Sequence, residues 1–517
     1  MCGIGITIKT ISPSCSEITG HMNPEETGDN RNHESSSIED SIWRSISPRG
    51  PDFRQRTSRV ISRHLRPAIY SYGMAKFLMD FQQVIILDHV YTDQLFSDRF
   101  APLLYFSMKQ DSDVENDGQA VLYALENRGN RTIPGVFLGI EGPYAFIYHD
   151  VSLNQIWFGR DPLGRRSLMR LEEGDSSQRS TISLASHYDG QATLRSSELA
   201  TDSFFYVDLN NAESLRTTES EHFAPETTSQ HIHPLPVVVS PVQSVMWTDC
   251  TTLALLAHSH IPLTESIDLV NVAFENTRAA ANSKRNNNQT ANPDVFSVPD
   301  RRTGEESWKE LCQLTPGRIW KFVKVDVRIV DYLKYKDQIM ELMWPNDTVM
   351  DLSIAAALFF AAWGIGSCRL NPDSDECIPS YSCPARVFLS GLGADELLGG
   401  YSRHRSAFTS ESPWPNLIEE LQLDIDRIPT RNLGRDDRII AHHGREVRYP
   451  FLDRDGTGDK LLLRVLAQEL GLSQASKLVK RAIQFGARSA KLEGLEKGTA
   501  QVRLNGLPSS TTHVDTP

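Results

Sequence analysis

The stretch VFLSGLGADELLGGYSRHR, residues 387–405, carries the most specific pattern in this chain. An apolar run, which we expect to be a buried strand, leads into Ser390 and Gly391, and then Asp395 and Glu396 open a helix. Glycines let a nucleotide come close to the backbone, and carboxylates beside it can hold Mg²⁺ next to the phosphates. Acids that only offset a helix dipole would leave the four glycines of the stretch unexplained. The pattern therefore predicts a nucleotide site in a strand–loop–helix.

Strands and helices alternate on both sides of this stretch. Residues 267–274 (IDLVNVAF) and 318–327 (RIWKFVKVDV) have the composition of strands, and residues 349–364 that of a buried helix. This alternation predicts an α/β domain with a doubly wound parallel sheet. Upstream, three short β-rich runs, each bounded by turn residues, predict further strands: GVFLGI (135–140), YAFIYHD (144–150) and QIWFGRD (155–161).

Polar segments divide the chain into two predicted domains. Residues 209–236 form a polar stretch with prolines near its end, which is typical of a linker. We expect an N-terminal domain over 1–208 with a polar insertion at about 12–40, a C-terminal domain over 237–499, and a disordered tail over 500–517.

Composition narrows the class of protein. The 517 residues carry a formal net charge of −13, which argues against nucleic acid or an anionic membrane as a bulk partner. The seven cysteines form no CxxC pair, no apolar run is long enough to span a bilayer, and no secretion signal is recognisable. We expect a cytoplasmic protein without nucleic-acid or membrane partners. The oligomeric state cannot be predicted from the sequence.

The N-terminus offers a nucleophile. Removal of Met1 would give Cys2 a free α-amine with a pKa of about 8, which can act as the base for its own thiol. The alternative is an ordinary cysteine in an edge strand. Arg49, in SPRGPD (47–52), precedes a turn that can aim its guanidinium group at a carboxylate.

Cys2, Arg49 and the later hairpin FGRDPLGRRSL (158–168), in this order, resemble the class II glutamine amidotransferases. The resemblance implies an α+β N-terminal-nucleophile sandwich with αββα layers over 1–208. It also implies that Cys2 attacks the glutamine amide, that Arg49 holds the α-carboxylate, and that Asp117 holds the α-amine. The Asn-Gly pair that completes the oxyanion hole in that family does not occur in residues 55–103. Loss of such a donor costs about 100- to 1000-fold in rate.

The second half resembles the asparagine synthetases, whose SGxGADExxGGY element matches residues 390–401. In that family the Ser-Gly pair contacts the adenylate, which here implies roles for Ser390 and Gly391, and the acids Asp395 and Glu396 serve the magnesium–pyrophosphate side. Residues 431–453 and 478–490 resemble the C-terminal motifs of the family, with Lys480 at the catalytic-lysine position. The strand NVAFEN (271–276) implies an adenosine contact by Val272.

SVPDRRTG (297–304) and residues 348–364 narrow the resemblance to the asparagine synthetase domain-containing proteins. The resemblance implies an ATP-pyrophosphatase domain over 237–499 and a two-step reaction in asparagine biosynthesis. Aspartate would be adenylated by Mg-ATP, and ammonia from glutamine would then attack the acyl-adenylate. The implied cofactors are ATP and Mg²⁺, and the implied substrates are glutamine, aspartate and ATP.

SPVQSVMWTDC (240–250) departs from this pattern. The family's pyrophosphate loop has Ser-Gly-Gly where this chain has Val245, Met246 and Trp247, although the magnesium-side acid Asp249 is present. Bulky side chains there predict weak or absent adenylation.

Four interpretations remain open: a working glutamine-dependent synthetase, an ammonia-dependent one, a non-catalytic scaffold that binds nucleotide or protein, and an active enzyme whose deduced sequence contains misplaced exon boundaries. Sequencing the transcript across the codons for 55–110 and 236–250 tests the last.

Overall fold

The computed structural model describes residues 4–11, 55–60, 66–73, 85–87, 117–140, 142–150, 152–173, 181–188, 194–209, 217–219, 247–276, 294–410, 412–452, 468, 470–474, 485 and 487–491. By its internal contacts the chain divides into two compact units, residues 1–228 with 505–517, and residues 229–504. The apolar run 237–239, predicted as a strand, and the predicted tail lie outside the described residues.

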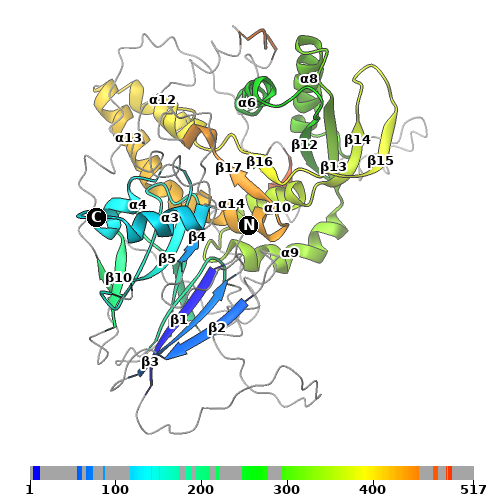
Figure 1. Ribbon diagram of the computed structural model, residues 1–517. Helices are drawn as coiled ribbons and strands as arrows, with labels where there is room; N and C mark the ends of the chain where they lie inside the picture. The colour runs from blue at the N-terminus through cyan, green and yellow to red at the C-terminus, as the bar shows by residue number, and fades with distance from the viewer. Residues whose placement is uncertain are drawn as a thin grey trace, which may run out of the picture. The chain divides into compact units, whose positions relative to one another are not determined.

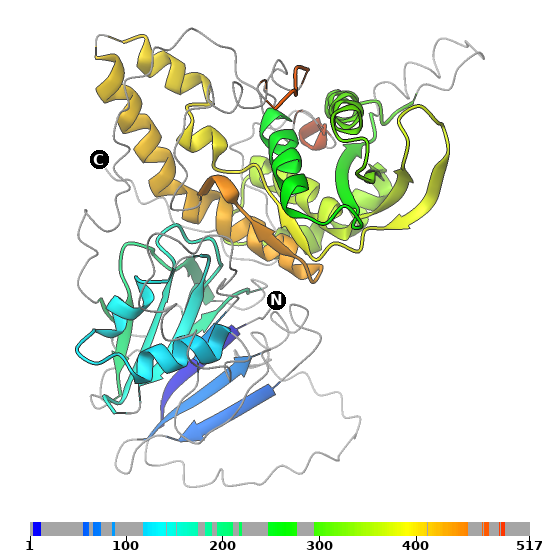
Figure 2. The same ribbon diagram turned by 45° about the horizontal axis from the view of Figure 1, so that its top comes forward.

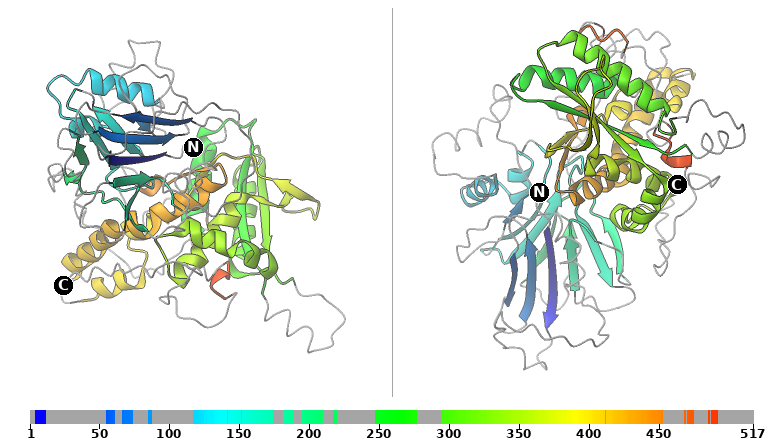
Figure 3. Two further views of the ribbon diagram at one scale, coloured as in Figure 1. Left: turned by 90° about the horizontal axis from the view of Figure 1, so that it is seen from below. Right: turned by 90° about the vertical axis from the view of Figure 1, so that its right-hand side faces the viewer.

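Unit 1 contains two antiparallel sheets (Figure 1). The first has the strand order β2-β3-β1-β8-β7-β9, and the second has the order β11-β10-β6-β5-β4. The strands are β1 (Ile4–Ile11), β2 (Gln55–Val60), β3 (Arg66–Gly73), β4 (Ile85–Leu87), β5 (Ala145–Asp150), β6 (Gln155–Arg160), β7 (Met169–Glu173), β8 (Thr181–Ala185), β9 (Leu194–Glu198), β10 (Phe205–Asp208) and β11 (Thr217–Glu219). Figure 3 shows strands of both sheets from two further directions.

The two faces of strand β5 pack against different layers of unit 1. Its side chains alternate between two faces: Ala145 and Ile147 pack with Leu184 of the first sheet, whereas Phe146 and Tyr148 pack with helices α3 (Asp117–Glu126) and α4 (Ile133–Phe137). Phe146 stacks on Phe137 of α4 with 3.5 Å between ring centroids. The described part of unit 1 is therefore a helix–sheet–sheet arrangement, in which the second sheet is covered on both faces.

The predicted strand at residues 135–140 is wrong, because helix α4 occupies its first half and no strand follows over 138–140. The Thr132 side chain accepts a hydrogen bond from Gly135 N–H, and Pro134 lies in the first turn. This capping arrangement starts a helix and overrides the β-rich composition of the segment. The strands predicted within 144–150 and 155–161 are confirmed as β5 and β6.

Unit 2 contains a four-stranded sheet with the order β12-β13-β14-β15 and a separate parallel pair, β16 and β17. The strands are β12 (Ile267–Phe274), β13 (Trp320–Val327), β14 (Ile365–Arg369), β15 (Cys377–Ser382), β16 (Val387–Leu389) and β17 (Glu446–Arg448). The helices are α6 (Trp247–His260), α8 (Pro299–Leu314), α9 (Ile329–Met343), α10 (Val349–Trp363), α11 (Ala394–Leu397), α12 (Ser402–Phe408), α13 (Pro413–Ile428) and α14 (Gly434–His442), with shorter helical segments η3 (Pro429–Leu433), η4 (Pro450–Leu452) and η6 (Ser489–Lys491).

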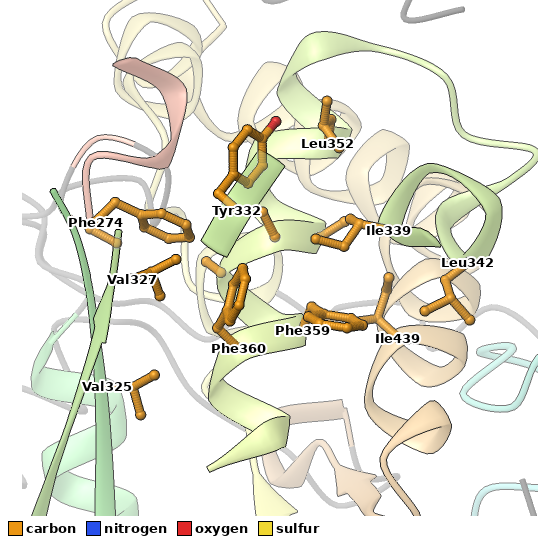
Figure 4. Close-up of a cluster of buried hydrophobic side chains, with 14 of the residues drawn as sticks. Phe274, Val325, Val327, Tyr332, Ile339, Leu342, Leu352, Phe359, Phe360 and Ile439 are labelled. Atoms are coloured by element: carbon orange, nitrogen blue, oxygen red, sulfur yellow. The ribbon is translucent and has the colours of Figure 1, made fainter. Parts of the chain in front are cut away.

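Helices cover both faces of the parallel pair β12–β13. Trp320 and Phe322 pack with α6 and α8, whereas Val323 and Val325 pack with α9 and α10. Figure 4 shows the second of these clusters, with Phe274, Val327, Tyr332, Phe360 and further labelled side chains converging from β12, β13, α9, α10 and α14. This pair is the described part of the predicted doubly wound sheet.

The rest of that sheet differs from the prediction. β14 pairs antiparallel with both β13 and β15. The connection 370–376 makes β14 and β15 a hairpin, since a parallel pair would need a crossover connection of a dozen or more residues. Figure 2 shows α12 and α13 as a second hairpin, made of helices. In the described residues, no helix is both long and apolar enough to cross a membrane.

Candidate functional site

The stretch 387–405 folds as a strand, a loop and one helical turn. β16 runs parallel to β17, and Ser390 N–H continues the ladder by donating to Arg448 O at 2.9 Å. Ser390 Oγ accepts a hydrogen bond from Leu392 N–H at 3.2 Å, so this hydroxyl shapes the loop that follows. The predicted order of elements is confirmed here. The expected burial of the strand is wrong, because Val387 and Leu389 are 39% and 46% exposed.

Two glycines of this stretch are required by its geometry. Gly393 has a φ of 97°, which side-chain-bearing residues rarely adopt, and a Cβ there would lie 2.5 Å from Leu452 Cγ. A Cβ on Gly400 would lie 1.8 Å from Asp395 Oδ1. The glycines therefore shape the loop and allow the chain to pack directly on an acidic side chain.

The two acids of the stretch are buried, with Asp395 8% and Glu396 3% exposed. Both carboxylate oxygens of Glu396 accept hydrogen bonds: Oε2 from Gly393 N–H at 3.1 Å and Oε1 from the Tyr401 hydroxyl at 2.5 Å. Buried carboxylates need such partners, because desolvation otherwise disfavours their charge. Glu396 is thus tied to the loop that precedes it.

The donor set fits Mg²⁺ held together with a phosphate. In the described part of the chain, no group of three or more His, Cys, Asp or Glu side chains could hold a metal by itself. Mg²⁺ is usually bound through one or two carboxylates, with waters and substrate phosphates as its other ligands. Asp395, in the first turn of α11 and packed against Gly400, is the carboxylate that we consider for that role.

Val272, the predicted adenosine contact, lies on β12. Its side chain is partly buried against the cluster formed by α9, α10 and α14, so it belongs to a different packing cluster from Ala394 of α11. The neighbouring Asn271 is buried, and its Oδ1 accepts a hydrogen bond from Arg301 Nε at 2.7 Å. Arg301 also pairs with Asp326 at 2.6 Å. The stretch 297–304 therefore ties α8 to β12 and β13.

The remaining predicted site residues are described in part or not at all. Asp117 is the first residue of α3, and Asp249 lies in the first turn of α6, which begins at Trp247; for both, the structure describes the backbone. Cys2, Arg49 and Lys480 lie outside the described residues. The structure thus places Ser390, Gly391, Asp395 and Glu396 in one loop and its helix, and the predicted roles of all the site residues stay predictions.

The residues that support this loop through Glu396 were not predicted from the sequence. Tyr401, His404 and Asp424 form a hydrogen-bonded series that ends at Glu396. A signal was present, since Tyr401 and His404 belong to the quoted stretch 387–405. Asp424 lies on a different helix, α13, and only the fold brings it to His404.

No protein-family model matches the chain. The asparagine synthetase domain-containing protein YML096W of Saccharomyces cerevisiae is 33% identical to it over 529 residues, covering 93% of this chain and 94% of the yeast protein. This chain belongs to the asparagine synthetase domain-containing protein family. The family resemblance of the sequence is thereby confirmed.

Other members of this family match over less of their length. The chicken asparagine synthetase domain-containing protein 1 is 41% identical over 289 residues, which is 47% of this chain. The chain covers 45% of the chicken protein, and the same share of the human and mouse proteins of that name. Among solved structures, a glutamine PRPP amidotransferase from B. subtilis is 10% identical with a TM-score of 0.26, covering 62% of this chain and 65% of its own. A likeness this weak carries no argument.

Proposed function

We propose that this protein makes asparagine from aspartate, with Mg-ATP to activate the acceptor carboxylate and glutamine as the source of ammonia. Membership of the asparagine synthetase domain-containing family supports the reaction class. The observation that carries the proposal is the loop 390–393 with Asp395 buried behind it. A glycine-bearing loop with a buried acid fits a nucleotide phosphate and its Mg²⁺.

Residues of unit 2 take the nucleotide side of the reaction. Ser390 and Gly391 would contact the adenylate, Val272 would contact the adenosine, and Asp395 and Asp249 would hold Mg²⁺ beside the pyrophosphate. Lys480 stabilises the charge that develops as the acyl-adenylate forms and breaks down. ATP supplies a good leaving group, because adenylation converts the unreactive carboxylate into an electrophile.

We assign Glu396 a role that differs from the one the family resemblance implies. Because both of its oxygens already accept hydrogen bonds, we place it in support of the loop rather than in direct contact with Mg²⁺. In this proposal Asp395 binds the metal and Glu396 stabilises the loop 390–393.

Residues of unit 1 take the glutamine side. Cys2 attacks the amide with its own α-amine as base, Arg49 pairs with the α-carboxylate, and Asp117 pairs with the α-ammonium group. Asp117 stands at the start of α3. Water then hydrolyses the thioester on Cys2 to give glutamate. The released ammonia attacks the acyl-adenylate and displaces AMP, after pyrophosphate has left in the adenylation step.

Aspartate-dependent exchange between ATP and labelled pyrophosphate tests the synthetase. We expect exchange by the full chain and a loss of about 100-fold or more in Asp395→Asn, because a ligand of the metal is removed. Asp337→Asn, an exposed acid on α9, is the matched control and should leave exchange unchanged. Exchange at equal rates in both variants would contradict the role of Asp395.

Release of glutamate from glutamine tests the other half. The wild-type chain should release glutamate above background and Cys2→Ala should not. Synthesis with free ammonia and without glutaminase activity would identify an ammonia-dependent enzyme, in line with the missing Asn-Gly pair.

A second candidate function is a nucleotide-binding scaffold. The observation that favours it is helix α6, which begins at Trp247, directly after Val245 and Met246 in the place of a glycine loop. Bulky residues there oppose close approach of a pyrophosphate to the backbone. Binding of Mg-ATP without any pyrophosphate exchange would identify this function.

A further inference from the structure

Tyr401 is linked through Glu396 to residues 390–393, the proposed nucleotide loop. Gly399 ends the turn after α11 with a φ of 66°, a conformation that favours glycine. The turn brings the residues that follow it back toward the start of α11. The Tyr401 hydroxyl then donates to Glu396 Oε1 at 2.5 Å, while Glu396 Oε2 accepts Gly393 N–H at 3.1 Å. One carboxylate therefore joins the phenol on one side to the loop amide on the other.

Tyr401 is the hydrogen-bond donor in its contact with Glu396. Burial, followed by the charges of Glu396 and Asp395, raises the pKa of Tyr401 far above its usual range. The phenol is therefore a hydrogen-bond donor at any physiological pH. Its partner Glu396 is 3% exposed and accepts hydrogen bonds at both oxygens.

A second layer orients Tyr401. His404 Nδ1 accepts a hydrogen bond from Tyr401 N–H at 3.3 Å, so the ring proton is on Nε2, which lies 2.8 Å from Asp424 Oδ2. Arg403 donates to both oxygens of Asp424 and lies over the Tyr401 ring, 4.3 Å from its centroid. Residues of helices α12 and α13 thereby fix the orientation of Tyr401, which donates to Glu396.

We propose that Tyr401 is a positioning residue for the nucleotide loop, and that it acts through Glu396 and is oriented by His404 and Asp424. The series fixes Gly393 N–H and the course of the chain from Ser390 to Asp395. The inference rests on the proposed function for what the loop binds, but its structural part does not depend on any ligand.

The consequence of losing the phenol follows from the geometry. Without it, Glu396 stays buried but loses the hydrogen bond at Oε1, so its carboxylate turns toward other donors or water. The bond to Gly393 N–H then opens more often, and the adjacent Asp395 is held less firmly.

Amide hydrogen exchange of the full chain tests the inference without any ligand. In Tyr401→Phe we expect exchange in peptides spanning 387–398 to rise about tenfold or more, the range expected for loss of a bond to a charged group. Peptides of β12 and β13 should be unchanged. Tyr335→Phe, another half-buried tyrosine whose ring packs on Phe359 and Trp363, is the matched control and should leave 387–398 unchanged.

Unchanged exchange over 387–398 in Tyr401→Phe would overturn the proposal. Should that variant accelerate exchange across the whole unit, Glu396→Gln takes its place, since it keeps the shape of the side chain and removes its charge. Faster exchange confined to 387–398 in Glu396→Gln supports the proposal, and no change there overturns it.

Magnesium titration of the exchange reaction tests the link to function. If the wild-type chain catalyses pyrophosphate exchange, Tyr401→Phe should raise the Mg²⁺ concentration for half-maximal rate about tenfold and leave the KM for aspartate within about twofold. A lower kcat at an unchanged Mg²⁺ dependence would overturn the positioning role. A wild-type chain without exchange would sink the proposed function and still leave the hydrogen-exchange result to decide on Tyr401.

Discussion

Gly400 packs against the carboxylate of Asp395 so closely that a Cβ atom on Gly400 would lie 1.8 Å from Asp395 Oδ1 and 2.9 Å from its Cα. The φ of Gly400 lies outside the left-handed region, so steric contact rather than backbone conformation requires glycine here. The backbone also makes the contact directly, because Gly400 N–H donates to Asp395 O at 2.9 Å. The absence of a side chain at residue 400 is therefore part of how Asp395 is placed.

Gly400→Ala should displace Asp395. The added methyl group cannot be accommodated without a shift of the carboxylate or the turn, so we expect a loss of about 1–3 kcal/mol in stability, as for overpacked sites. Mg-dependent ATP binding should weaken more than stability alone explains. Urea unfolding and calorimetric titration measure the two effects. Gly317→Ala is the control, because a Cβ at Gly317 meets nothing within 4 Å; equal behaviour of both variants would contradict the steric role.

Arg318 holds the C-terminal end of α6. Its guanidinium group donates to the carbonyl oxygens of His258, Ile261, Pro262 and Glu265 at 2.5–2.9 Å, and its own side chain is 5% exposed. Arg318→Met keeps much of the apolar stem and leaves these carbonyls without their donor. We expect a loss on the order of 3 kcal/mol in urea unfolding. Arg328→Met, at an exposed arginine, should have little effect; a similar loss in both variants would show that the contacts of Arg318 are not responsible.

The buried pair of Arg435 with Asp351 joins α14 to α10 at 2.7 Å. Asp351→Ala leaves a buried guanidinium group with Asp436 as its described carboxylate partner. Breaking such a pair typically costs about 3–5 kcal/mol, because the remaining charge stays desolvated. Thermal or urea unfolding measures the loss. Asp331→Ala removes the partner of an exposed arginine, Arg328, and should cost much less.

Asp424 predicts a loss of stability in acid. Burial opposes its ionisation, but hydrogen bonds from His404 and Arg403 together with the charge of Arg403 outweigh burial and lower its pKa below the usual range. A carboxyl whose folded pKa is depressed stabilises the fold above its unfolded pKa of about 3.9, and this contribution is lost as the pH falls through the folded value. We therefore expect the helical hairpin α12–α13 to open below about pH 4.

Hydrogen exchange of α12 and α13 at pH 6 and pH 3 measures this effect. Asp424→Asn should show a smaller difference between the two pH values than wild type, because the titrating group is gone. Other carboxyls titrate in the same range, so the comparison with Asp424→Asn isolates the contribution of this residue. Identical pH dependence in both proteins would rule out Asp424 as the group responsible.

The sequence predicted secondary-structure elements correctly where their local pattern agrees with their packing. β12 begins and ends where its apolar run does, with Val270, Val272 and Phe274 facing one cluster. Helix α10 begins after the capping residue Thr348 and ends at Trp363, with Gly364 in the left-handed conformation beyond it. Its apolar composition on all sides matches a helix buried between a sheet and two further helices.

The sequence was insufficient where capping and short-range hydrogen bonds outweigh composition. The β-rich run after Pro134 is helix α4 because a cap and a proline in the first turn outweigh side-chain propensity. The family resemblance implies a magnesium-side role for Glu396, and the loop-supporting role that we propose for it rests on contacts instead. Its hydrogen bonds to Gly393 and Tyr401 depend on the turn at Gly399, which composition alone does not specify.

The central claim is that the loop from Ser390 to Asp395 binds Mg-ATP, and calorimetric titration of ATP into the full chain tests it most directly. We expect binding that requires Mg²⁺, that weakens about tenfold or more in Asp395→Asn through loss of a carboxylate ligand, and that is unchanged in Asp337→Asn. ATP binding of equal affinity in all three proteins, or none with Mg²⁺ present, would contradict the claim.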